Sequence, residues 1–119
     1  MEKNRYVKGL RGEKAAETYL TGLGMRCLAR RYRAQDGEID LIMDDGGMIV
    51  FVEVKSRPNS RAGTGLLAVT PAKQRRMTHA AMEYITGGEG IGKPVRFDVV
   101  EITADGVRHV KNAFLCGGW

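Results

Sequence analysis

Apolar residues recur near the start of the chain with the period of a helix. In residues 8–23, Ala16, Leu20 and Leu23 follow one another at spacings of four and three. Gly24 comes directly after the last of them and is typical of a helix C-terminal cap. The pattern therefore predicts an amphipathic helix that ends at about residue 23.

Further along, alternating or continuous apolar segments lie between pairs of turn residues and predict strands. The predicted strands are residues 25–33, 38–44, 48–55, 95–102 and 107–113. A long loop, residues 56–69, follows the third strand, and Thr70 with Pro71 then starts a second helix that extends to about Ile85. The order αβββαβ(β) predicts an α/β fold with a mixed sheet flanked by helices. A length of 119 residues fits a single domain, residues 1–119.

The second and third predicted strands form a hairpin that sorts charged and apolar residues onto different faces. Alternation places Asp40, Glu53 and Lys55 together on one face. Two registers are open: a loop of residues 45–48 puts Asp40 opposite Glu53, and a shorter turn puts it opposite Phe51 and diagonal to Glu53. In both registers the other face is aliphatic, with Ile39, Leu41, Met43, Val50, Val52 and Val54.

Two carboxylates placed this close repel each other unless one is protonated or a cation lies between them. Mg²⁺ accepts one or two carboxylates together with waters and substrate phosphate, which suits Asp40 and Glu53. Lys55, on the same face, is placed to position a water or to neutralise transition-state charge. The structural alternative is a half-exposed sheet on which Lys55 simply neutralises Glu53.

Two further acids lie in apolar surroundings. Glu13 is close to the buried side of the first helix, where a carboxylate requires a partner or a metal ion. Asp98 lies within an apolar strand. Two interpretations of Asp98 remain open: it pairs with Arg96, or it lies at the edge of the site formed by the hairpin.

The distribution of charge favours a polyanionic partner. The chain has 19 Lys and Arg against 14 Asp and Glu, a net charge of +5, and residues 54–82 contain no acid. We expect basic residues that flank the carboxylates to contact nucleic acid, with Arg57 as a phosphate clamp. These predicted contacts are Arg31, Arg33, Arg57, Arg61, Lys73, Arg75 and Arg76. A solvated charged surface is the alternative for each run.

The sequence shows no secretion or membrane signal. No apolar segment approaches the roughly 20 residues needed to span a bilayer, and the first residues are polar. The two cysteines, Cys27 and Cys116, match neither a zinc spacing nor a disulfide framework. We therefore expect a cytoplasmic protein without a membrane partner.

Several segments together resemble a known superfamily. An Asp followed by Glu-x-Lys on a hairpin is similar to the PD-(D/E)XK nucleases, which have the restriction-endonuclease-like fold. The closer resemblance is to the YraN-like family of small bacterial proteins and extends from about Gly9 to Phe114. It rests on residues 12–13 (GE), 37–42 (GEIDLI), 51–57 (FVEVKSR) and 96–100 (RFDVV).

The resemblance implies a restriction-endonuclease-like αβββαβ core. It further implies metal ligands at Asp40 and Glu53, a catalytic lysine at Lys55, and a helix carboxylate, Glu13, that completes the site. Ile39 stands where the superfamily motif often has proline.

The expectation is a Mg²⁺- or Mn²⁺-dependent endonuclease acting on DNA. Resolvase-like cleavage of branched or structured DNA is suggested because the relatives include Holliday-junction resolvases. The alternatives are a non-catalytic nucleic-acid-binding module, or a nuclease subunit that depends on a partner in repair, recombination or uptake. The small size of the chain leaves little room for a separate recognition domain and is compatible with a homodimer.

Overall fold

The elements follow the predicted order. A computed structural model describes residues 2–57, 69–88 and 90–115, with side chains from Arg11 onward. The elements are α1 (Glu2–Gly22), β1 (Arg26–Arg33), β2 (Glu38–Asp45), β3 (Met48–Arg57), α2 (Pro71–Thr86), β4 (Val95–Thr103) and β5 (Gly106–Phe114). Thr70 caps α2 as predicted, because its hydroxyl accepts a hydrogen bond from the Lys73 N–H at 3.2 Å.

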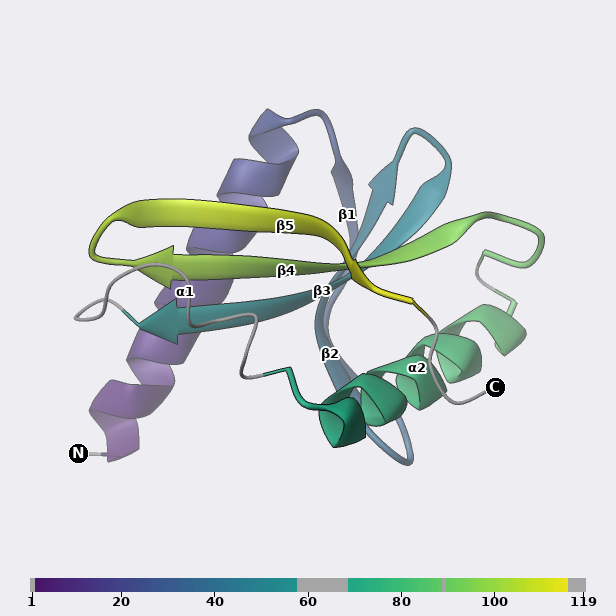
Figure 1. The fold of residues 1–119 in the computed structure, drawn as a ribbon, viewed down its shortest axis with the longest axis horizontal. Coiled ribbons are helices and arrows are strands. Elements are labelled where there is room, and N and C mark those ends of the chain that lie inside the picture. Colours follow the sequence, from purple (N-terminus) through teal and green to yellow (C-terminus); the bar gives the residue numbers. More distant parts are fainter. Residues whose placement is uncertain (1, 58–68, 89, 116–119) are drawn as a thin grey trace.

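The five strands form one mixed sheet in the order β1-β2-β3-β4-β5. The β3–β4 pair is parallel and the other three pairs are antiparallel. The parallel pair requires a crossover, which α2 supplies. Helices α1 and α2 cover opposite faces of the sheet (Figure 1). The protein thus has the predicted α/β architecture with a restriction-endonuclease-like αβββαβ core.

Burial on both faces explains why residues 49–52 of the central strand are all apolar. Under α1, Ala16 and Leu20 pack on the aliphatic residues Leu41, Met43, Val50, Val52 and Val100. Under α2, a larger cluster includes Ile39, Ile42, Ile49, Phe51, Met77, Ala80, Ala81, Phe97 and Val99. The alternative of a half-exposed sheet is therefore wrong for the hairpin, since residues 49–53 of β3 are all buried.

Three details of the predicted elements are wrong. Helix α1 begins at Glu2, six residues before its predicted start at residue 8. Leu23 is 50% exposed, since it follows the end of the helix, where Gly24 (φ +98°) turns the chain and Met25 is buried instead. Ile39 packs with the α2 cluster and not with the aliphatic face, and it lies on the part of β2 that precedes the ladder with β3, which begins at Leu41.

Some predictions concern parts of the chain that the structure does not describe. Most of the predicted loop after β3, including Arg61, lies outside the described residues, as does Cys116. Strand β3 itself continues to Arg57, two residues beyond its predicted end. Within the described part of the chain, no helix has both the length and the apolar character needed to cross a bilayer.

Gly12 allows α1 to lie directly against the end of β3. A Cβ atom at this position would be 2.6 Å from the Ser56 Cβ, a distance that real side chains do not adopt. Because neither atom belongs to the free end of a long side chain, one element would have to shift. The close approach places Glu13, the next residue, beside the strand that carries Glu53 and Lys55.

We expect Gly12→Ala to lower the free energy of unfolding by about 1–3 kcal/mol, because the added methyl group overpacks this contact. Gly22→Ala is the matched control: it lies in the same helix with nothing within 4 Å of the added Cβ, so alanine should stabilise by roughly 0.5–1 kcal/mol. Urea unfolding of both variants measures the difference. Equal effects at the two positions would contradict the close approach.

Candidate active site

The site lies where β2 and β3 separate. Asp44 pairs with Ile49 and the ladder ends at Leu41 and Val52, which puts Asp40 opposite Glu53. This is the first of the two predicted registers. Beyond the ladder, the Asp40 Oδ2 atom accepts the Val54 N–H at 2.8 Å. A side-chain carboxylate thus takes a place that a backbone carbonyl of β2 would otherwise fill.

Glu53 is held by two lysines from different elements. Its side chain is 3% exposed, and its Oε2 atom lies 3.0 Å from the Lys55 Nζ and 3.2 Å from the Lys73 Nζ. The lysine side chains are 23% and 29% exposed, so both ammonium groups lie between the buried carboxylate and solvent. Lys73, predicted as a nucleic-acid contact, therefore belongs to the same cluster as Lys55.

The proximity of the two carboxyl groups strongly perturbs Asp40. Burial, the charge of Glu53 and a hydrogen bond to Glu53 raise the pKa of Asp40 from 3.8 to about 8, against the opposing effect of the Val54 N–H. The charge of Glu13 raises it further. At neutral pH this carboxyl therefore retains a proton that it would release to solvent if it were exposed.

Glu13 has a partner on the neighbouring strand. The Arg31 Nε lies 2.8 Å from Glu13 Oε1, and the Arg31 Nη2 lies 3.3 Å from Glu13 Oε2. The partner that burial demands is thus an arginine. Arg30 makes a similar two-pronged ion pair with Glu17, one helical turn further along α1. These four side chains line a cleft of about 440 Å³ between α1 and β1.

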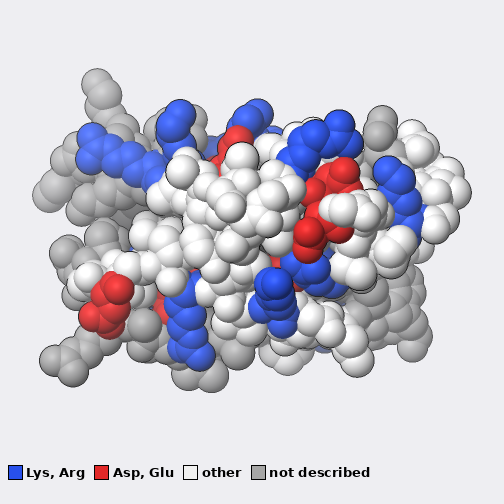
Figure 2. Space-filling view, turned by 90° about the horizontal axis from the view of Figure 1, so that it is seen from above, with Lys and Arg blue, Asp and Glu red and all other residues white. Residues whose placement is uncertain are grey.

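The other predicted nucleic-acid contacts are more dispersed. Arg75 and Arg76 are exposed on α2, Arg57 is half-buried with a partner, and Arg33 lies 3.7 Å from Glu38. On the face shown in Figure 2, Lys and Arg side chains are interspersed with Asp and Glu. Among the residues that are coloured or white in this view, the basic side chains form no continuous patch.

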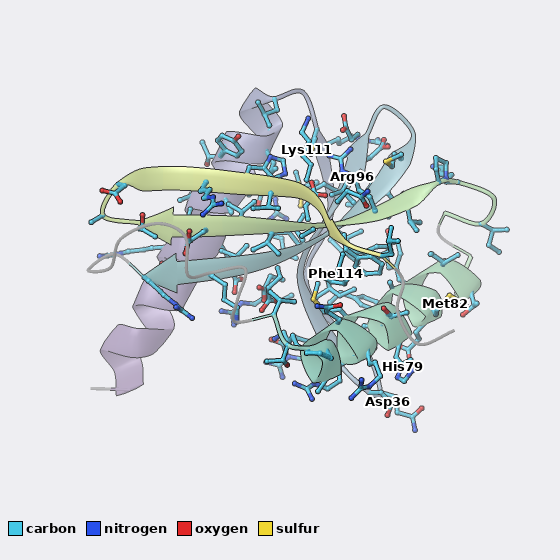
Figure 3. All side chains as sticks on the ribbon, in the orientation of Figure 1. Asp36, His79, Met82, Arg96, Lys111 and Phe114 are labelled. Carbon is cyan, nitrogen blue, oxygen red and sulfur yellow. The ribbon has the colours of Figure 1, made fainter. Side chains whose placement is uncertain are left out.

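Of the two interpretations of Asp98, the structure supports the first, in which it pairs with Arg96. It is fully buried and accepts hydrogen bonds from the Arg96 Nε at 2.9 Å and the Asn112 N–H at 3.0 Å, and lies 2.7 Å from the His109 Nε2. Tyr19 of α1 packs edge-on against His109. Figure 3 shows Arg96 on the side of the sheet away from α2, with His79 and Asp36 beside α2. Asp98 thus joins β4 and β5 under α1.

One buried acid of this region is missing from the sequence analysis. Glu101 is 3% exposed on β4, where it is the register neighbour of Lys55 on β3 and of Arg108 on β5. The alternation of β4 gives the signal, because Glu101 continues the face of Phe97 and Val99. Glu101 therefore places a further carboxyl group on the strand next to Lys55.

The donor atoms present suit a hard divalent cation. Asp40 and Glu53 offer carboxylate oxygens, and Mg²⁺ or Mn²⁺ binds through one or two such groups with waters and phosphate completing the shell. Burial and the charge of Glu53 raise the pKa of Asp40, and a cation between the two carboxyl groups would oppose both effects. Among the side chains the structure describes, no three His, Cys, Asp or Glu converge on one point, since Glu13 is turned to Arg31.

The fold thus defines a protein of the restriction-endonuclease-like class. Comparison with known families gives the next step: the chain belongs to a family described as "Uncharacterised protein family UPF0102", whose model matches residues 12–102. This is the predicted YraN-like resemblance.

Relatives in this family match along almost the whole chain. A UPF0102 protein of Symbiobacterium thermophilum is 49% identical over 111 residues, covering 89% of this chain and 94% of the relative. One from Geobacter sulfurreducens is 41% identical over 113 residues, covering 91% and 88%. One from Lachnoclostridium phytofermentans is 43% identical over 112 residues, covering 93% and 95%. Their names state the family and no activity.

Proposed function

We propose that this protein is a metal-dependent endonuclease that hydrolyses DNA phosphodiesters, with branched or structured DNA as the substrate class. One observation carries the proposal. Two carboxyl groups are forced together at the fork of β2 and β3, and two lysine ammonium groups converge on one of them. As plain structure this arrangement is costly, because it raises the pKa of Asp40 to about 8.

The acids and lysines have separate roles in this proposal. Asp40 and Glu53 would hold Mg²⁺ or Mn²⁺, which when bound polarises a phosphoryl oxygen and lowers the pKa of its water. A cation held there would compete with the Asp40 proton for the same oxygens, so Asp40 would act as a ligand in its ionised form. The Lys55 Nζ orients the attacking water and donates to the phosphate oxygen on which charge develops.

Lys73 has a supporting role from the start of α2. Its ammonium contacts the same Glu53 oxygen as Lys55, so it restrains the carboxylate and neutralises charge beside it. Arg75 and Arg76 lie on the same first turns of α2 and are exposed. A phosphate backbone that enters the site from this side would meet these guanidinium groups, which supports nucleic acid as the substrate.

Metal binding separates a nuclease from a module that only binds nucleic acid. Calorimetric titration with Mn²⁺ should show one site in the wild type and none in Asp40→Ala, since the variant lacks half of the carboxylate pair. Glu38→Ala is the matched control, because Glu38 lies two residues away on the same strand and is exposed. Absence of Mn²⁺ binding by the wild type, with and without DNA, would favour the binding module.

A panel of DNA structures then tests the reaction itself. Single-stranded, nicked, flapped and four-way substrates are incubated with Mg²⁺ or Mn²⁺, and strand products are resolved on denaturing gels. We expect metal-dependent cleavage of at least one structured substrate. Metal binding without cleavage of any substrate would support the partner-dependent subunit instead.

A further inference from the structure

Arg31 belongs to the same row of the sheet as the two carboxylates. On β1, Arg30 pairs with Leu41 and Tyr32 pairs with Ile39, which places Arg31 opposite Asp40. Asp40 in turn lies opposite Glu53 on β3. The sheet thus brings one guanidinium group beside the carboxyl pair, from the edge strand β1.

The backbone of Arg31 departs from regular strand geometry. Its φ is +50°, a left-handed conformation that a residue with a side chain adopts only at some cost. Its two neighbours pair with β2, Arg30 with Leu41 and Tyr32 with Ile39. The Arg31 side chain reaches α1, where both Glu13 oxygens are engaged.

This contact changes what Glu13 offers to the site. Glu13 is close enough for its charge to raise the pKa of Asp40, yet it does not form a three-acid cluster with Asp40 and Glu53. Its carboxylate is 18% exposed and is satisfied by the guanidinium group. Glu13 therefore contributes to a cation site only by exchanging Arg31 for the cation.

We propose that Arg31 is a positioning residue that competes with a divalent cation for Glu13. In the metal-free protein Arg31 occupies both Glu13 oxygens, and this ion pair must break before Glu13 can act as a ligand. The inference rests on the metal site of the proposed function. Release of Arg31 from Glu13 leaves a guanidinium group beside the site, where it is placed to take a phosphate oxygen of the substrate. Metal binding and substrate binding are then linked through one ion pair.

The chain supplies an unusually close control for this inference. Arg30 adjoins Arg31 on β1, and its Nε and Nη2 lie 2.6 and 2.7 Å from the Glu17 oxygens in the same cleft. Arg31→Gln and Arg30→Gln remove the same charge from adjacent positions. Only the first frees Glu13.

The experiment titrates Mn²⁺ alone into the full-length protein by calorimetry. We expect Arg31→Gln to bind Mn²⁺ about tenfold more tightly than the wild type, and Arg30→Gln to change affinity by less than about threefold. Adding Glu13→Gln to Arg31→Gln should cancel most of the gain, because the freed ligand is then missing. Arg31→Lys retains the charge but not the two-pronged contact, so it should bind about two- to threefold more tightly and serves if Arg31→Gln does not fold. Its matched control is then Arg30→Lys, which also keeps the charge and should leave the affinity unchanged.

The outcomes separate this inference from the proposed function. Equal gains in Arg31→Gln and Arg30→Gln, or a gain that persists without Glu13, would overturn the competition while the metal site stands. No Mn²⁺ binding by the wild type or any Arg31 variant would overturn both. The predicted pattern of affinities without DNA cleavage would support the competition and leave the nuclease proposal without its activity.

Discussion

Lys55→Ala is expected to reduce DNA cleavage by about 10²–10⁴-fold, the range typical of removing a positioned proton-transfer or charge-stabilising group. The Lys55 ammonium lies 3.0 Å from Glu53 Oε2, and the Lys55 side chain is 23% exposed, so it faces the carboxylate pair and remains accessible to a substrate. Alanine leaves Asp40 and Glu53 in place. Mn²⁺ affinity should therefore be retained or increased while the cleavage rate falls, as single-turnover kinetics and calorimetry on the same protein would show.

Other lysines provide the comparison for this variant. Lys73→Ala removes the second ammonium from Glu53, and because Lys55 remains, we expect a smaller loss of about 10–10²-fold. Lys93→Ala removes an exposed lysine at the hairpin end of β2, remote from Asp40, and should leave the rate unchanged. Cleavage by Lys55→Ala at the wild-type rate would mean that the activity comes from another site or from a contaminant.

The hairpin shows how far a sequence determines such a site. The period of two along a strand was sufficient to predict that Asp40 and Glu53 lie on one face. The Asp- and Gly-rich turn left two registers open, and the structure has the one in which the two acids are opposite each other. The same local rules place Lys55 beside Glu53, and the capping pair Thr70-Pro71 correctly places the start of α2. These features depend on neighbours within a few residues or across one short turn.

The contacts that complete the site depend on elements far apart in the chain. The distance between Lys73 and Glu53 is set by how α2 crosses back over the sheet, and no periodicity in the sequence reports that crossing. Arg31, which contacts Glu13, has a left-handed backbone conformation that nothing in the sequence predicts for an arginine in a strand. The choice between the two roles of Asp98 likewise required the packing of β5, which brings His109 to it.

Because Asp40 and Glu53 lie together, we expect the free energy of unfolding of the metal-free protein to fall at high pH. The pKa of Asp40 is raised from 3.8 to about 8. Between these two pH values the folded protein therefore holds a proton that the unfolded chain has released. Stability from this group is fully present below about pH 4 and is lost as the pH rises through about 8. One pKa unit corresponds to about 1.4 kcal/mol, so the loss above pH 8 is on the order of several kcal/mol.

Asp40→Asn should therefore stabilise the metal-free protein by roughly 2–4 kcal/mol at pH 8.5, with little effect near pH 4. The amide oxygen still accepts the Val54 N–H, and the amide NH₂ replaces the proton that Asp40 shares with Glu53. Urea unfolding with chelator at both pH values measures the effect. Asp44→Asn, on the same strand, should have the opposite sign, because the Gly47 N–H and Arg26 lower the pKa of Asp44. An Asp40→Asn variant no more stable than wild type at pH 8.5 would mean that the two carboxylates do not oppose each other, and the strongest physical reason for a cation at this site would be lost.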